Sequence, residues 1–152
     1  IYRNYNKPIN IIVIKKVKNY CRHRKIKFYI ANNFKLALKL KLDGVYLPSF
    51  NKDFYHNSYI YKKDFEILGS AHNLYETKIK CKQKVQQIFI SPVFKEKNNN
   101  ILGLYNFCKF KNFTNKSLIA LGGANTKNIK RLRMLKVKGF AAINFFKKKK
   151  GP

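Results

Sequence analysis

The chain has 152 residues, the size of one ordinary domain; its 45% hydrophobic and 15% aromatic content argues against a disordered chain, and no apolar run approaches the roughly 20 residues of a membrane span. The formal net charge is +28, but 29 of the 34 basic residues are lysine, whereas base recognition favours arginine. Lysine, asparagine, isoleucine, phenylalanine and tyrosine are encoded by A/T-rich codons, so we attribute the charge to genome composition and expect no specific nucleic-acid partner and no membrane association, with a selected polyanion partner as the alternative.

Short β-branched or aromatic runs alternate along the chain with stretches of helical spacing. The runs expected to form strands are 1–5, 26–31, 44–48, 66–71, 87–92, 117–123 and 139–146. The helices are expected to begin with Pro8 in a first turn, at Asn32 or Asn33 as N-cap, and then to cover 72–83, 102–112 and 125–139, the last stopped by Gly139. Residues 49–63 are polar and predict a loop with one short helix.

The alternation of seven strands with helices predicts parallel βαβ units in a single domain over residues 1–152. Right-handed crossovers leave two architectures, an open doubly wound sheet or a (β/α)8 barrel. An open sheet would carry a glycine-rich loop after its first strand, and no glycine follows 1–5. We therefore predict an α/β fold of the TIM-type (β/α)8 barrel, with seven of the eight strands present. Because the chain starts with Ile1 inside a strand, we expect the first βα unit to be missing.

Two glycines end the run 117–123, just before an expected helix N-terminus near Asn125 and Thr126. Glycine permits a positive φ and a close approach of the backbone, while free N–H groups and the helix dipole favour an anion. With Asn144 ending the next strand, Gly122 and Gly123 predict a phosphate site. The alternative for the two glycines alone is a tight turn between strand and helix.

Ser70 and His72 lie two residues apart at the end of the run 66–71, so their side chains point the same way if the strand extends that far. A hydroxyl and an imidazole can orient a polar substrate or move a proton, which makes the two residues catalytic candidates. The alternative is that one of them caps the following helix. The chain has only six acidic residues, and only Asp53 is near a strand end, which is a poor basis for a dedicated magnesium site.

Three cysteines, Cys21, Cys81 and Cys108, show no close spacing, and an odd number does not suit a disulfide framework. We interpret them as thiols in a reducing compartment and, because no signal peptide is visible, expect a cytoplasmic location. Three scattered histidines make no metal-binding signature.

The motifs YRNY, ANNFKLALKLKLDGVYLPS, ILGSAH, ISPVF followed by LGL, IALGGANTKNI and GFAAINF resemble, in order and spacing, the thiamine phosphate synthase/TenI family of (β/α)8 barrels. They cover nearly the whole chain from the family's second strand onward, and their combination is specific although each piece alone is weak. The resemblance implies a role in thiamine biosynthesis. The family's synthase joins a pyrimidine methyl diphosphate to a thiazole phosphate and releases diphosphate, using magnesium, whereas TenI-type relatives bind or tautomerise the thiazole phosphate.

The resemblance also implies which residues bind the phosphorylated thiazole or pyrimidine ligand. Ser70 matches the serine of the family's fifth strand, and His72 lies beside it. The positions that it assigns to substrate binding are Arg3, Tyr5, Asn32, Asn51, Lys97, Asn98 and Asn99. The positions that it assigns to phosphate binding are Gly122, Gly123, Ile143 and Asn144.

This sequence departs from the family pattern at the diphosphate side. Asn32 and Asn51 fall where the family has its acidic magnesium ligands, and amides lack the charge that a hard divalent cation requires. Tyr5 replaces a lysine. We therefore regard magnesium as doubtful, and expect the monophosphate cradle to be kept and the diphosphate chemistry to be impaired. We therefore predict a synthase-like transferase. The alternatives are a tautomerase, a non-catalytic phosphate-binding barrel and a basic nucleic-acid-associated protein.

Overall fold

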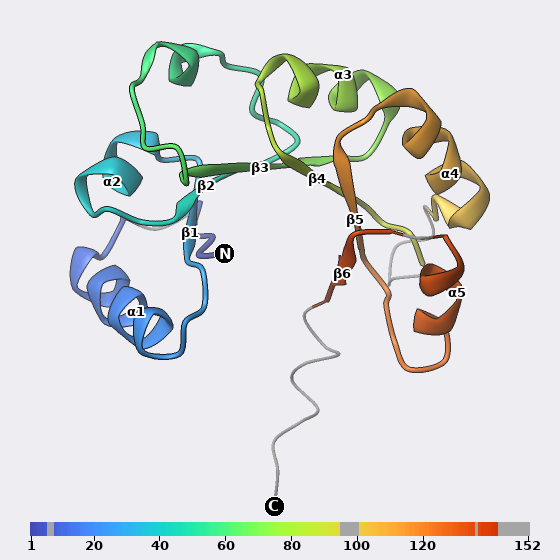
Figure 1. Cartoon of the computed structure of the whole chain (residues 1–152), viewed down its shortest axis with the longest axis horizontal. Coiled ribbons are helices and arrows are strands. Elements are labelled where there is room, and N and C mark those ends of the chain that lie inside the picture. The colour runs from blue at the N-terminus through green and yellow to red at the C-terminus, as the bar shows by residue number, and fades with distance from the viewer. Residues whose placement is uncertain (6–7, 95–100, 136, 143–152) are drawn as a thin grey trace, which may run out of the picture.

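The structure is a computed structural model that describes residues 1–5, 8–94, 101–135 and 137–142. Helices and strands alternate along these residues (Figure 1). The elements are α1 (Ile11–His23), β1 (Tyr29–Ala31), α2 (Phe34–Lys39), β2 (Gly44–Leu47), the 3-10 helix η1 (Tyr55–Ser58), β3 (Glu66–Ala71), α3 (Leu74–Lys82), β4 (Gln87–Ile90), α4 (Gly103–Phe113), β5 (Ser117–Leu121), α5 (Ile129–Met134) and β6 (Gly139–Ala141).

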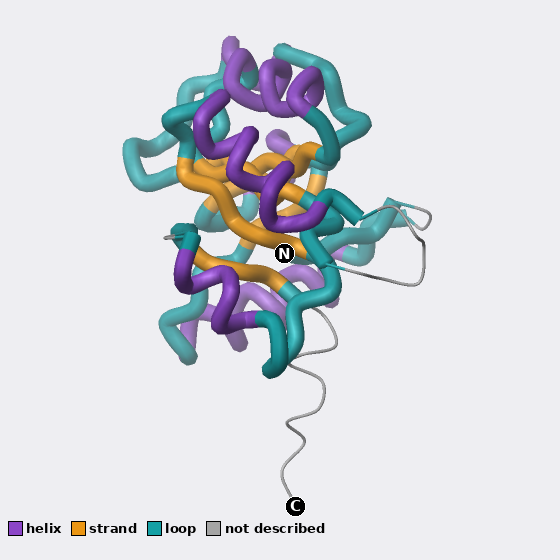
Figure 2. Tube along the Cα trace, turned by 90° about the vertical axis from the view of Figure 1, so that its right-hand side faces the viewer, coloured by secondary structure: helices purple, strands orange, loops and turns teal. Residues whose placement is uncertain are grey.

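The six strands form one sheet in chain order, and each strand pairs in parallel with the next. In Figure 1 the sheet curves into an arc with the helices on its outer side, and the perpendicular view in Figure 2 places the strands between helices. Right-handed crossovers that each return a helix to the same side produce this arrangement. The predicted parallel α/β alternation is therefore confirmed. Over the described residues no pairing joins β6 back to β1, so the sheet is not closed into a ring.

The predicted strand over residues 1–5 is wrong, because the segment contributes a single bridge to the sheet. Tyr2 pairs with Ile30; its N–H donates to Tyr29 O at 2.8 Å, and its carbonyl accepts from Ala31 N at 2.9 Å. Only Tyr2 of the segment packs against the core, whereas Arg3 is exposed. Without burial on both sides, a longer strand gains little. Over the described residues the sheet therefore has six strands and one bridge where seven strands were predicted.

Asparagine side chains set the starts of three helices. Asn10 Oδ1 accepts from Val13 N and begins α1, so Pro8 precedes the helix instead of sitting in its first turn. Asn33, one of the two residues expected, caps α2. Asn73 Oδ1 accepts from Glu76 N at 2.8 Å and caps α3. The alternative that Ser70 or His72 caps this helix is therefore wrong.

The C-terminal helix is shorter than predicted. It was expected over 125–139 with Gly139 as its stop, but α5 ends at Met134 and Gly139 is the first residue of β6. The predicted short helix within 49–63 is confirmed as η1.

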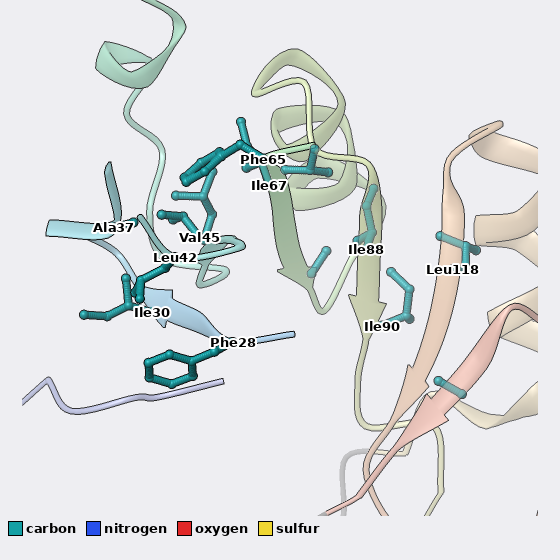
Figure 3. Packing of buried hydrophobic residues seen from close by; sticks show 14 of the residues in the cluster. Phe28, Ile30, Ala37, Leu42, Val45, Phe65, Ile67, Ile88, Ile90 and Leu118 are labelled. Carbon is teal, nitrogen blue, oxygen red and sulfur yellow. The ribbon is translucent and has the colours of Figure 1, made fainter. Parts of the chain in front are cut away.

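The core has two layers because alternate residues of each strand face opposite sides of the sheet. The larger layer packs between the sheet and the helices and includes Ile67 and Ile88 (Figure 3). The smaller layer lies on the inner side and consists of Tyr46, Leu68 and Phe89, with the Tyr46 and Phe89 rings 5.8 Å apart edge to face. Burial of one such side chain contributes about 1.5–3 kcal/mol. Both faces of the central strands are therefore covered, as in other parallel sheets.

None of the described helices has both the length and the apolar character needed to cross a membrane. Cys21, Cys81 and Cys108 are half-buried free cysteines in the structure.

Candidate functional site

The predicted site residues of the described chain gather at one edge of the sheet, which we call the carboxyl edge because the strands end there. Asn32 directly follows β1, Asn51 lies in the segment after β2, His72 follows β3 and Gly122 follows β5. Ser91, which was not predicted as a site residue, follows β4. The parallel pairing places these five strand ends next to one another in chain order. In barrels of parallel strands this edge carries the chemistry.

The ends of β1 and β2 are joined by an amide pair. Asn51 Nδ2 donates to Asn32 Oδ1 at 2.5 Å, although the two residues are 19 positions apart. Asn32 has a φ of 56°, a left-handed conformation that asparagine tolerates better than most residues, and its N–H donates to Tyr46 O at 2.9 Å. Tyr5 reaches the same segment, since its ring lies edge to face with that of Phe50 at 5.3 Å. The structure therefore brings together Tyr5, Asn32 and the segment that carries Asn51.

One side chain of helix α3 and that of its C-cap residue, Gln83, hold the segment between β2 and η1. Lys80 Nζ donates to Pro48 O at 2.8 Å and to Asn51 O at 2.7 Å. Gln83 Nε2 donates to Asn51 Oδ1 at 2.9 Å and to Asp53 O at 2.8 Å. The third Lys80 hydrogen bond goes to Gln83 Oε1 at 2.9 Å, which links the two side chains.

Both of these side chains are fully buried, each with 0% exposure. Burial lowers the pKa of the Lys80 ammonium to about 8, and the nearby charge of Glu76 opposes this effect only in part. Sequence analysis missed both residues, because Lys78, Lys80 and Lys82 alternate along the helix and nothing local separates the buried one from the exposed ones.

The amide pair does not fit a magnesium ion. Asn32 Oδ1 already accepts from Asn51, and Asn51 Oδ1 accepts from Gln83 and from Asp53 N at 3.0 Å. Both groups are neutral, whereas magnesium sites in proteins are built on carboxylates. Within the described ranges no group of three or more His, Cys, Asp or Glu side chains could hold a metal. The donor set at this part of the carboxyl edge therefore provides neither the charge nor the free oxygens for the ion.

Ser70 is on the inner side of the sheet. It follows Leu68 by two residues in β3, pairs in register with Phe89 and is 5% exposed. The other described residues give its hydroxyl no hydrogen-bond partner, so the group is available on the face where a ligand of a barrel would lie.

His72 lies outside the strand, because β3 ends at Ala71. The expected alignment of its side chain with that of Ser70 therefore does not follow from strand geometry. Its Nδ1 is instead 2.8 Å from Ser91 O and 3.3 Å from Ser91 Oγ. A carbonyl oxygen can only accept, so Nδ1 carries the hydrogen, and in the neutral ring Nε2 keeps its lone pair. The ring thus links the ends of β3 and β4 and has one basic nitrogen unused by this contact.

The two glycines after β5 adopt positive φ values, 95° at Gly122 and 63° at Gly123. Side chains are disfavoured in this region, so glycine is required here, in agreement with the predicted backbone turn. The predicted helix start near Asn125 and Thr126 is wrong, since α5 begins only at Ile129.

The physical reason is a side-chain turn at Asn125. Its Oδ1 accepts from Lys127 N at 2.9 Å and from Asn128 N at 3.1 Å. Asn128 Nδ2 in turn donates to Gly123 O at 2.9 Å. These bonds hold the segment in a turn and use two of the N–H groups that a helix N-terminus would have offered to an anion.

Five predicted residues lie outside the described residues: Lys97, Asn98, Asn99, Ile143 and Asn144. Their assignments to substrate and phosphate binding stay predictions. Arg3 is described and exposed.

Comparisons with known proteins agree on one family. The family described as "Thiamine monophosphate synthase" (TMP-TENI) matches residues 3–146. The chain is 30% identical over 148 residues to a thiamine-phosphate synthase of Prochlorococcus marinus, and 26% identical over 151 residues to one of Hydrogenobaculum sp.. Each match covers 94% of this chain, which spans 43% of the first relative and 69% of the second.

A solved structure supports the fold. The thiamine phosphate pyrophosphorylase from Pyrococcus furiosus, a TIM barrel, superposes with a TM-score of 0.71 at 20% identity, over 87% of this chain and 64% of that one. The predicted fold class is thereby confirmed, with the ring of strands left open over the described residues. With the family match extending over nearly its whole length, the chain belongs to the thiamine monophosphate synthase family.

Proposed function

We propose that this protein is a thiamine phosphate synthase-like transferase of thiamine biosynthesis, which couples a pyrimidine methyl diphosphate to a thiazole phosphate and releases diphosphate. The observation that carries the proposal is the carboxyl edge. Five consecutive strands end there in amides, a hydroxyl, an imidazole and two glycines with positive φ, in a chain that belongs to the family. Uncharged hydrogen-bonding groups of this kind suit a polar heterocycle with a phosphate arm.

The described residues divide into two roles in this proposal. Gly122 and Gly123 let the backbone approach the monophosphate of the thiazole. Ile143 and Asn144, which lie outside the described residues, stay predicted to share this role. The hydroxyl of Ser70 and the free nitrogen of His72 face the reacting rings, where they orient polar atoms and accept a proton. The net charge of +28 raises the local concentration of phosphorylated substrates around any such site.

A second candidate is favoured by the amide pair. Asn32 and Asn51 offer no carboxylate, and their oxygens are occupied by hydrogen bonds. Departure of diphosphate depends on cationic stabilisation worth several kcal/mol. A barrel that binds or tautomerises the thiazole phosphate without coupling it needs no such group. The second candidate is therefore a TenI-like tautomerase or a non-catalytic binding protein.

Turnover separates the two candidates. The full-length protein is incubated with both phosphorylated precursors and magnesium, and release of diphosphate is measured beside formation of thiamine phosphate. Both products are expected for the transferase. Binding of thiazole phosphate by calorimetry, without turnover, would support the second candidate and contradict the first.

A charge placed at the phosphate position tests the basis that both candidates share. Gly123→Asp is expected to weaken thiazole phosphate binding at least about tenfold, through the added negative charge and the strained φ. Gly139→Asp is the matched control, because Gly139 starts β6 at the opposite edge and no heavy atom lies within 4 Å of a Cβ placed there. Equal affinities in the two variants would refute both candidates.

A further inference from the structure

The buried pair of Lys80 in α3 and Gln83 at its C-cap has no part in the chemistry proposed above, yet it contacts the segment that carries Asn51. We infer that Lys80 and Gln83 form an internal clamp that fixes the Pro48–Asp53 segment and so positions the Asn51 side chain against Asn32 at the carboxyl edge. Lys80 is then a positioning residue. The consequence for ligand binding rests on the proposed function, whereas the clamp itself does not.

The hydrogen bonds of the clamp are complete. An ammonium has three donors, and Lys80 Nζ has three acceptors, two main-chain carbonyls of the segment and the Gln83 amide oxygen. Lys80 and Gln83 are three positions apart, Lys80 in the last turn of α3 and Gln83 at its C-cap, so both side chains leave this end of the helix on one face. No buried side-chain nitrogen or oxygen of the described residues lacks a partner.

Burying the Lys80 ammonium costs more free energy than burying an apolar side chain of similar size. A buried ammonium is costly unless it is paired, and Lys80 forms no ion pair with any described carboxylate. An apolar side chain would occupy the volume without that cost. What the ammonium provides, and an apolar group cannot, is a directional hold on the carbonyls of Pro48 and Asn51.

Gly69 in β3, which lies against the Lys80 side chain, leaves space for that side chain because it has no Cβ. A Cβ at Gly69 in β3 would lie 2.9 Å from Lys80 Cδ, closer than real Cβ contacts allow, and 3.3 Å from Lys80 Cγ, which is tighter than most. A glycine in the middle of a strand is otherwise unfavourable. The absent side chain therefore leaves the path along which the lysine stem reaches the segment.

The clamp also reaches the far end of the segment. Gln83 donates to Asp53 O, and its own carbonyl is 2.8 Å from His56 Nε2 of η1. The His56 ring stacks on Phe34 at 4.7 Å and is 3% exposed. Asn51 is consequently held through its carbonyl by Lys80 and through its Oδ1 by Gln83, which leaves only its Nδ2 to face Asn32.

Hydrogen exchange tests the clamp without any ligand. In Lys80→Met, the amides of residues 49–54 are expected to exchange at least about tenfold faster, because local opening no longer breaks the clamp. Peptides from β4 and β5 are expected to keep their protection. Lys78→Met and Lys82→Met remove exposed lysines from the same helix and are the matched controls. Unchanged exchange over 49–54 in Lys80→Met would overturn the inference.

A second variant covers the case in which Lys80→Met does not fold. Gly69→Ala keeps the ammonium but obstructs its stem, and is expected to raise exchange over the same residues. If the Lys80 side chain is displaced in Gly69→Ala and residues 49–54 still exchange as slowly as in the wild type, that result would count against the clamp.

A double-mutant cycle tests the positioning role. Lys80→Met is expected to weaken binding of the pyrimidine methyl diphosphate about tenfold in the wild-type background and not at all in Asn51→Ala. If the affinity losses of the two single variants multiply in the double variant, Lys80 does not act through Asn51, and its positioning role is refuted. If the wild-type protein binds neither precursor, the proposed function fails, and the exchange experiment still decides whether the clamp exists.

Discussion

At Gly44, the first residue of β2, the addition of a single methyl group should strongly lower the free energy of unfolding. A Cβ built there lies 1.9 Å from Glu66 O and 2.8 Å from Glu66 C, on the backbone of the neighbouring strand β3. Gly44 and Glu66 are direct partners in the parallel register. Backbone atoms cannot rotate away as a flexible side chain can, so in Gly44→Ala the two strands must separate.

The separation sets the size of the effect. Ordinary van der Waals contact begins at 3.4 Å, so the strands must open by about 1.5 Å at this end. Such an opening breaks two or three hydrogen bonds around Gly44, each worth about 0.5–1.5 kcal/mol, and overpacking adds about 1–3 kcal/mol. We expect Gly44→Ala to lower the free energy of unfolding by about 3–5 kcal/mol, a large part of the roughly 5–15 kcal/mol of a typical domain.

Urea denaturation measures this loss, as a fall of the midpoint at unchanged slope. Gly139→Ala is the matched control, because Gly139 also begins a strand and a Cβ there meets nothing within 4 Å. We expect the control to stay within about 1 kcal/mol of the wild type. If the free energies of unfolding of the two variants differ by less than about 1 kcal/mol, the close approach of β2 and β3 at Gly44 is refuted.

Three further outcomes are expected. Burial raises the pKa of Glu66, but hydrogen bonds from Lys27 and Tyr29 outweigh it and hold the pKa below its ordinary value. This stabilisation is therefore present above the unfolded-state pKa and is lost as pH falls through the folded-state pKa. Glu66→Gln should flatten the change in urea midpoint between about pH 6 and about pH 3; an unchanged slope would contradict the assignment. Asn73→Ala removes the N-cap of α3 and should cost about 1 kcal/mol by thermal unfolding, and a cost near zero would count against the cap. Magnesium alone should leave the unfolding temperature unchanged, because the amide pair holds no free ligand set; a clear rise would reveal a site.

Much of the fold could be predicted because the relevant signals are local. The spacing of Ile11, Ile14 and Val17 and the apolar runs of β2 to β5 predict helices and strands from neighbouring residues alone. The errors fell where a local pattern had no tertiary support. Residues 1–5 have strand-like composition, but only Tyr2 packs against the core. The helix expected from Asn125 is delayed because an asparagine side chain offers the backbone a competing turn.

The candidate site was predictable only in part. Gly122 and Gly123 were identified from their place after a strand, and their positive φ values agree. Asn32 and Asn51 were identified through the family resemblance alone, and their direct contact joins residues that no local rule connects. The end of β3 at Ala71 was predicted, but the partnership of His72 with Ser91 was not, because it depends on which strand pairs beside β3 and in what register.

The sequence by itself determined the order of strands and helices, the parallel class of the sheet and the set of residues at the strand ends, because each depends on the periodicity of side chains along a short stretch. Only the tertiary structure decided which lysine of α3 is buried. The helix carries almost no amphipathic pattern, and Lys80 differs from Lys78 and Lys82 solely in facing the Pro48–Asp53 segment and the space left by Gly69. That choice depends on packing between residues about 30 positions apart, which the local sequence around a lysine does not encode.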